Sequence, residues 1–248
     1  MSDALIPGLA ILPVVRASRA VPVIEVLGTG FFVGIGTQRR FVTAKHVIVK
    51  NPLVGSDESY AVVYRQGDDT KVVRIDDIAL SSDYDVAAGN VSRSLMRGTV
   101  PLKIALENPA LNDDIFCYEY SSTRIETIMG NTHVAFEPYF HKGNTVRFLD
   151  DDRERGNVPS FLTSFPALQG ASGAPVMGAT KTRKLAVVGM MVGNVERHLM
   201  PAQIVEIRDG DKYSDSTSYF LPYGQAISHA PLGRALESLK IQFEYADE

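Results

Sequence analysis

The sequence has no excess of positive charge. Its 25 lysine and arginine residues are outnumbered by 29 aspartate and glutamate residues, so the net charge is −4 over 248 residues. A protein that binds DNA or RNA through bulk positive charge would have the opposite balance. The charge therefore argues against a nucleic-acid partner.

Long apolar runs are also missing. The longest stretches, such as Ala186–Val192, are far shorter than the roughly 20 residues that a helix needs to cross a bilayer. The N-terminal segment Met1–Gly8 lacks the basic region that opens a secretory signal. We therefore expect no transmembrane helix, no export signal and no membrane partner.

Cysteine is nearly absent, because Cys117 is the single one in the chain. It cannot form an internal disulfide, so the fold must depend on its core, and this favours a reducing, cytoplasmic setting. The alternating segment Asp114–Tyr120 predicts a strand in which Cys117 packs inward. The alternative, a nucleophilic thiol, is less favoured.

The composition and the hydrophobic pattern predict a mostly β globular protein. Hydrophobic residues make up 45% and charged residues 22%, which is the globular range, and we find no repeat of fixed period. Short runs rich in β-branched and aromatic residues recur between turn residues, as in a sandwich or barrel. The candidate strands are Val21–Leu27, Thr29–Ile35, Phe41–Ala44, Tyr60–Arg65, Lys71–Ile78, Ile115–Tyr120, Ile125–Met129, Thr132–Phe136, Ser160–Ser164, Leu185–Val192 and Ser218–Leu221.

A polar, proline-bearing stretch, Glu107–Asp114, is the candidate linker between two β halves, residues 1–108 and residues 109–248. One helix is predicted near the end of the chain. Ser228 is its candidate N-cap and Pro231 suits its first turn, and the apolar positions Leu232, Ala235, Leu236 and Leu239 recur at helical spacing. We expect this apolar stripe to pack on the second half. The charge run Asp150–Gly156 is interpreted as a solvated loop, with a cation site as the alternative.

Three short segments suggest chemistry. The first combines Gly28–Val33 with Phe41–Val47, the second is Asp83–Ala87, and the third is Leu168–Val176. Together they resemble the trypsin-like, chymotrypsin-fold serine peptidases, and among these the disulfide-free bacterial type related to HtrA. The resemblance implies an all-β fold of two antiparallel six-stranded β-barrels with a C-terminal helix.

The same resemblance assigns roles to three residues in the order His46, Asp85, Ser172. A serine hydroxyl is a poor nucleophile near neutral pH, so Ser172 needs a base such as His46 to take its proton. The carboxylate of Asp85 would hold the imidazole in one tautomer and stabilise its charged form. The backbone N–H groups of Gly170 and Ser172 would form the oxyanion hole.

The chain departs from the family pattern at several positions. Ala171 stands where digestive trypsins have the aspartate that pairs with a new N-terminus, so we expect no activation by N-terminal processing. The oxyanion hole must then be preformed or be organised by a substrate or a regulatory partner protein. Ala174 replaces a second glycine, Val192 replaces a serine that often holds the acid, and Lys45 is expected to be exposed.

The resemblance also implies a substrate pocket whose floor precedes Ser172 and whose walls come from the later strand. The implied residues are Phe165, Pro166, Ala167, Met190, Met191, Val192, Gly193 and Asn194. None of them is acidic, and desolvating a substrate cation without a partner is costly. We therefore expect a protein or peptide substrate with a small or medium apolar side chain before the scissile bond.

Three alternatives stay open. Asp83 could be the acid in place of Asp85. The fold could serve as a catalytically weak or inactive binding module. Ser172 could also belong to an α/β-hydrolase elbow with His229 and a later aspartate, but this needs helices between parallel strands. No two histidines stand at ligand spacing, so we predict no metal site and no cofactor.

Overall fold

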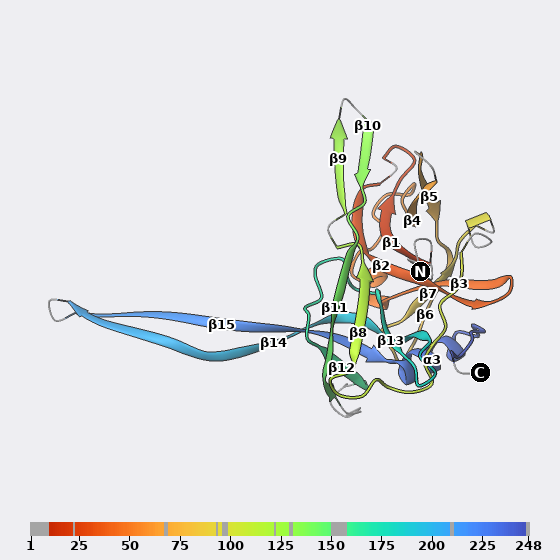
Figure 1. Ribbon diagram of the computed structural model, residues 1–248. Helices are drawn as coiled ribbons and strands as arrows, with labels where there is room; N and C mark the ends of the chain where they lie inside the picture. Colours follow the sequence, from red (N-terminus) through yellow and green to blue (C-terminus); the bar gives the residue numbers. More distant parts are fainter. Residues whose placement is uncertain are drawn as a thin grey trace, which may run out of the picture.

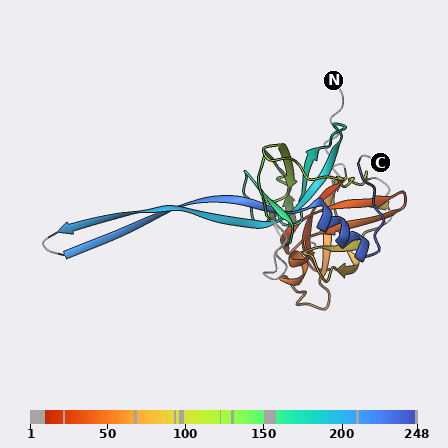
Figure 2. The ribbon, with the colours of Figure 1, turned by 90° about the horizontal axis from the view of Figure 1, so that it is seen from below.

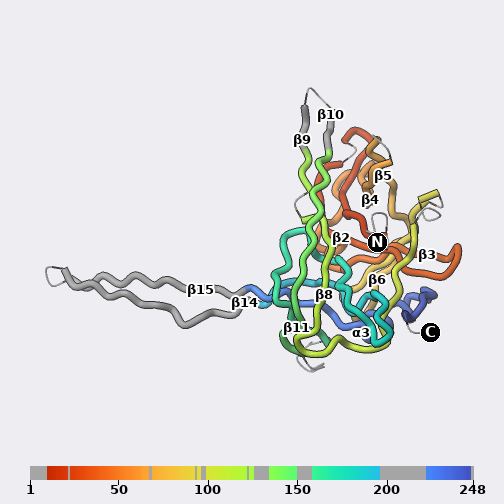
Figure 3. Tube along the Cα trace, in the orientation of Figure 1, coloured from red at the N-terminus to blue at the C-terminus, as the bar shows by residue number. Residues whose placement is uncertain are grey.

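The computed structural model describes residues 10–21, 23–66, 69–92, 94–95, 99–121, 123–128, 131–149, 158–208 and 211–246 (Figure 1). Two β units follow one another along the chain, as the colours of the trace show (Figure 3). The first is a sheet built from β1 to β7, and the second is a closed barrel built from β8 and β11 to β15. No helix among the described residues is long and apolar enough to span a membrane.

The first sheet has seven strands, and each pairs antiparallel with its neighbours. In sheet order they are β5 (Asp69–Arg74), β4 (Ser59–Gln66), β1 (Ile11–Ala17), β2 (Glu25–Ile35), β3 (Gln38–Thr43), β7 (Ala87–Asn90) and β6 (Asp76–Leu80). The aromatic residues of β2 and β3 form the centre of its core, where the rings of Phe32 and Phe41 meet edge to face at 5.1 Å. A short helix, α1 (Lys45–Val49), follows β3 directly.

The strands of this sheet differ in detail from the prediction of a six-stranded barrel. Among the described residues, the terminal strands β5 and β6 are not paired with each other, so the seven-stranded sheet stays open. Strand β1 was not predicted, because Pro13 interrupts its apolar run and proline is unfavourable inside a sheet. The two candidates Val21–Leu27 and Thr29–Ile35 form one strand, β2, whereas Lys71–Ile78 is divided at the buried Ile75.

The second unit is the closed barrel that the resemblance implies. Its strands, in order, are β11 (Tyr139–Leu149), β12 (Ser160–Thr163), β15 (Asp211–Ser228), β14 (Leu185–Arg208), β13 (Pro175–Ala179) and β8 (Asp114–Glu119). Strands β14 and β15 continue beyond the barrel as a two-stranded hairpin (Figure 1). A further hairpin pairs β9 (Arg124–Ile128) with β10 (Asn131–Ala135). The sequence patterns did not predict β7, β11 or β13.

The predicted C-terminal helix is present as α3 (His229–Ser238), and Ser228 is its N-cap residue, although its side chain makes no capping hydrogen bond. Leu232, Ala235 and Leu236 are fully buried. They belong to a core that also contains Phe31 and other residues of the first sheet, so the stripe packs against more than the second half. The ribbon of α3 is the dark blue helix in Figure 2. The helix therefore helps to hold the two units together.

The remaining sequence interpretations have different outcomes. Cys117 is buried in β8, and burial raises the pKa of its thiol, which agrees with a packed strand residue. Before the predicted linker begins, Ile104 already pairs with Val187 and Tyr245 of the second half. The charge run Asp150–Gly156 lies outside the described residues.

Candidate active site

His46 is placed by the transition from strand to helix. Strand β3 ends at Thr43, Ala44 is the extended N-cap residue of α1, and His46 is the second residue of that helix. The first N–H groups of a helix have no partner within it. The N–H of His46 is satisfied by Asp85, whose Oδ1 accepts it at 2.8 Å. Asp85 therefore caps the helix that carries the imidazole.

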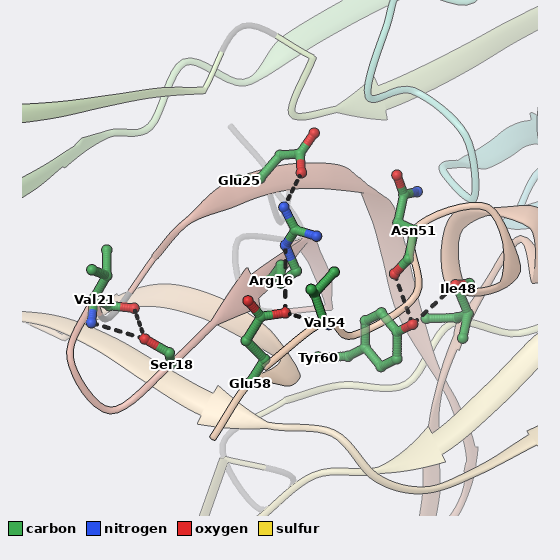
Figure 4. Close-up of polar contacts among 9 residues, drawn as sticks. All are labelled: Arg16, Ser18, Val21, Glu25, Ile48, Asn51, Val54, Glu58 and Tyr60. Carbon is green, nitrogen blue, oxygen red and sulfur yellow. Dashed lines mark hydrogen bonds and ion pairs between the residues drawn. The ribbon is translucent and has the colours of Figure 1, made fainter. Parts of the chain in front are cut away.

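The far end of α1 is fixed by Tyr60 of β4. Its hydroxyl lies 3.0 Å from the carbonyl oxygen of Ile48 and 2.8 Å from that of Asn51 (Figure 4). The carbonyls at the end of a helix need such partners. Nearby, Arg16 of β1 lies between the carboxylates of Glu25 and Glu58 (Figure 4). Asp85 at the start of α1 and Tyr60 at its end thus hold the helix against the first sheet.

Ser172 lies in the loop between β12 and β13. The chain turns sharply before it, and the N–H of Ala171 donates to the carbonyl oxygen of Leu168 at 2.9 Å. Gly170 at the third position of this turn has φ +99°, and Gly173 directly after the serine has φ +87°. Side chains are strained in this region, so glycine suits both positions.

The three distant side chains lie in one line. Nδ1 of His46 is 2.6 Å from Oδ2 of Asp85, and Nε2 of His46 is 2.8 Å from Oγ of Ser172. An ionised carboxylate only accepts hydrogen bonds, so Nδ1 carries the ring proton and Nε2 is left as the acceptor for the serine hydroxyl. This geometry allows a proton to pass from the hydroxyl to the imidazole.

The electrostatics favour the ionised form of Asp85. Burial raises the pKa of Asp85, but the hydrogen bonds and the charge of His46 outweigh this effect, and the net pKa is lowered. Lys45 contributes in the same direction. Its side chain is only half-buried rather than fully exposed as expected, and its Nζ donates to the carbonyl oxygen of Ser81 at 2.7 Å.

The two predicted oxyanion donors, the N–H groups of Gly170 and Ser172, are available for a ligand. Within the described part of the chain, neither group donates to a protein acceptor. The adjacent carbonyl oxygens are engaged, because Thr29 bonds that of Gly170 at 2.8 Å through its hydroxyl and that of Ser172 at 2.9 Å through its N–H. The carbonyls therefore have partners while the two N–H groups remain unbonded.

The residues of the predicted pocket come from two places, the loop between β12 and β13 and the strand β14. Met190 and Met191 are fully buried in the core, and Val192 packs against it. The side chain of Asn194 in β14 bonds both backbone groups of Ala167 in the loop before Ser172. It accepts from the N–H of Ala167 at 2.6 Å and donates to the carbonyl oxygen of Ala167 at 2.7 Å. The loop before Ser172 and the strand after it are thus held together.

A buried acid–histidine pair adjoins this region and was missed at the sequence level. The side chain of Glu119 is fully buried, and its Oε1 lies 2.7 Å from Nε2 of His141, whose ring stacks on Phe165 at 5.4 Å. Its Oε2 has no partner within the described structure. Burial raises the pKa of Glu119, and the hydrogen bond from His141 opposes the shift only in part. The alternation that places Ile115 and Cys117 inward also places Glu119 inward, and this signal could have revealed the pair.

The structure bears on two of the sequence alternatives, the choice of the acid and the α/β-hydrolase arrangement. Among the hydrogen bonds and ion pairs of the described residues, His46 pairs with Asp85 and none joins it to Asp83, whose Oδ2 accepts from the hydroxyl of Ser82 at 3.0 Å. His229 pairs with Asn108 at 2.9 Å, and the sheets are antiparallel, which excludes the α/β-hydrolase arrangement. Among the described residues, no three His, Cys, Asp or Glu side chains cluster as a metal site would require.

An antiparallel barrel beside an open sheet, with the His–Asp–Ser line between them, defines a chymotrypsin-like fold. The family model described as trypsin-like peptidase domain matches residues 28–190 of this chain. Because this match spans more than half of the sequence, the chain belongs to the trypsin-like peptidase family.

Solved structures of proteases share the fold. The active form of the Rv3671c protease of Mycobacterium tuberculosis is 16% identical with a TM-score of 0.58, and the match covers 97% of this chain and 85% of that one. Deg5 is 13% identical with a TM-score of 0.58, covering 94% and 89%. The MamO protease domain of Magnetospirillum magneticum is 12% identical with a TM-score of 0.53, covering 92% and 96%. No curated protein matches the sequence.

Proposed function

We propose that this protein is a serine endopeptidase that hydrolyses peptide bonds through an acyl-enzyme on Ser172. The observation that carries the proposal is the line from Asp85 through His46 to Ser172, with contacts of 2.6 and 2.8 Å. Membership of the trypsin-like peptidase family supports the same reaction class. No cofactor is needed for this chemistry.

The proposed reaction begins when Oγ of Ser172 attacks the carbonyl carbon of the scissile bond and Nε2 of His46 takes the hydroxyl proton. The imidazolium is stabilised by Asp85. The negative oxygen of the tetrahedral intermediate is bound by the N–H groups of Gly170 and Ser172. His46 then gives its proton to the leaving amine. In the second half of the reaction, His46 takes a proton from the water that attacks the ester and gives it to Oγ of Ser172 as the ester bond breaks.

The proposed substrate is a protein or peptide with a small or medium apolar side chain before the scissile bond. Phe165 and Ala167, two of the pocket residues that the resemblance implies, are apolar and belong to a buried apolar cluster beside Ala171. Among the described residues, Glu119 is the fully buried carboxylate, and it is already bonded to His141 and Ser121 through Oε1. Cleavage of a peptide library, followed by mass spectrometry of the products, tests this preference, and a dominant preference for lysine or arginine would contradict it.

The central experiment is labelling with a fluorophosphonate, which forms a covalent bond only with an activated serine. Intact mass and peptide mapping should find one adduct, on Ser172. The Ser172→Ala variant should lose it, and Ser238→Ala, a matched change on the remote helix α3, should keep it. A folded wild-type protein without any adduct would contradict the proposal and favour the second candidate.

That second candidate is a catalytically inactive binding module of the same fold. The observation in its favour is Ala171, which leaves the loop before Ser172 without a charged anchor. For both candidate functions, we propose that the protein is cytoplasmic and that a regulatory partner protein controls access to the site. Full activity of the isolated chain on unfolded casein would contradict such control.

A further inference from the structure

Thr29 of β2 contacts the loop that contains Ser172 and the residue that follows β8. It is fully buried, although threonine is a polar residue. Its hydroxyl donates to the carbonyl oxygen of Gly170 at 2.8 Å and accepts from the N–H of Tyr120 at 3.1 Å. Its own N–H donates to the carbonyl oxygen of Ser172 at 2.9 Å. Every polar group of the side chain is therefore used.

The direction of the hydroxyl proton follows from these partners. A backbone N–H is only a donor, so the hydroxyl oxygen must accept from Tyr120. A backbone carbonyl is only an acceptor, so the hydroxyl proton must point at Gly170. The hydroxyl therefore bridges two backbone groups that have opposite requirements, which no aliphatic side chain can do.

These bonds hold both ends of a three-residue segment. Gly170 begins the segment and Ser172 ends it, and between them they supply the nucleophile and both proposed oxyanion donors. The carbonyl of Gly170 belongs to the peptide plane between Gly170 and Ala171, and the carbonyl of Ser172 belongs to the plane between Ser172 and Gly173, so fixing both limits backbone rotation at the two ends of the segment. Thr43 in turn bonds the carbonyl oxygen of Thr29 at 2.7 Å, three residues before His46. The loop of the nucleophile is thus tied to the strand that leads to the base.

We propose that Thr29 is a positioning residue for the oxyanion donors, acting through its hydroxyl on the carbonyl of Gly170. This inference rests on the proposed function, because it concerns the rate of attack by Ser172. Thr29 makes no contact with His46 or Asp85 among the bonds of the described structure. Its loss should therefore affect transition-state binding and leave the base unchanged.

The test compares Thr29→Val, which keeps the shape and removes the hydroxyl, with Thr29→Ser, which keeps the hydroxyl. With a peptide substrate cleaved by the wild type, Thr29→Val should lower kcat by about 10- to 100-fold with little change in KM. This is a smaller effect than the roughly 10²- to 10³-fold loss that follows when an oxyanion donor itself is removed, because Thr29 acts through the backbone. Thr29→Ser should restore kcat to within a few-fold. The pH at which activity falls on the acid side should stay at its wild-type value, since the base is untouched.

The matched control is Thr145→Val, because Thr145 is also buried but its hydroxyl has no partner in the described structure. This change should leave kcat unaltered. Circular dichroism and thermal melts establish that each variant is folded. If Thr29→Val does not fold, Thr29→Ala is measured in its place, and the same loss of kcat with unchanged KM is expected.

The inference alone, and not the proposed function, would be overturned by a folded Thr29→Val or Thr29→Ala variant with wild-type kcat, or by a Thr29→Ser variant as slow as the valine variant. A change in KM alone would also overturn it, because that result indicates substrate binding. Absence of fluorophosphonate labelling in the wild type would instead overturn the proposed function, and the inference would fall with it.

Discussion

His46 bonds Asp85 at two points, through its backbone N–H to Oδ1 at 2.8 Å and through its ring Nδ1 to Oδ2 at 2.6 Å. The two bonds use both oxygens of the carboxylate, so the orientation of the acid is set by the helix that carries the base. The ring and the carboxylate are consequently positioned as one unit. A substitution that changes one of the two oxygens of Asp85 should therefore have a defined effect on the ring of His46.

The first prediction concerns Asp85→Asn. The amide oxygen can still accept from the backbone N–H of His46, so the amide NH₂ then faces Nδ1 and forces the ring proton onto Nε2. In that tautomer the ring cannot accept the proton of Ser172, and kcat should fall by about 10⁴-fold. Steady-state cleavage of a peptide measures this.

Asp83→Asn is the matched control for that experiment, since Asp83 is exposed and bonded to Ser82. It should keep wild-type activity. Equal losses in the two variants would show that Asp85 has no special role as the acid.

The second prediction concerns Gly173→Ala. A Cβ at this position would overlap the carbonyl oxygen of Thr29 and the hydroxyl of Thr43, and φ of +87° is strained for alanine. We expect the melting temperature and the rate of fluorophosphonate labelling both to fall. Gly36→Ala provides the comparison, because its φ is also positive but its Cβ would meet no neighbour. It should lose some stability and retain labelling, and an unaffected Gly173→Ala would contradict the close approach.

The third prediction concerns pH. The folded pKa of Glu119 is raised above that of an exposed glutamate, which is about 4.3, so its neutral form favours the folded state at low pH. This contribution is lost as the pH rises through the folded pKa. Glu119→Gln, which stays neutral, should therefore have a higher free energy of unfolding than the wild type at pH 7, and the gain should shrink near pH 4.

Urea denaturation at the two pH values measures this difference. His141→Phe keeps a ring for stacking on Phe165 but removes the hydrogen bond to Glu119, so it should destabilise the protein at pH 7. A loss of stability in Glu119→Gln that is independent of pH would contradict the prediction.

The fourth prediction concerns Asn194, whose side chain bonds both backbone groups of Ala167. Asn194→Ala removes this bridge and should loosen the proposed pocket, so KM should rise several-fold with a smaller effect on kcat. Asn90→Ala removes a comparable exposed amide, bonded to Asp77 in the first sheet, and should leave KM unchanged. A fall in kcat at constant KM would place the role of Asn194 in the chemical step instead.

The site was more predictable than the strands that support it. The motifs around His46, Asp85 and Ser172 are short and local, so one sequence was enough to propose them in order. Strand β1 was missed because Pro13 suggests an interruption, yet it lies between β4 and β2. The closed barrel agrees with the resemblance, whereas the first sheet is open because β5 and β6 do not meet among the described residues.

The sequence by itself determined the family, the β character, the C-terminal helix and the three candidate residues, since each follows from a local pattern of residue types. Only the tertiary structure decided the contacts of Thr29 and the pairing of Glu119 with His141. Thr29 is 91 residues from Tyr120 and 141 residues from Gly170 along the chain. Contacts over such separations depend on how the strands pair and pack, which no local pattern records.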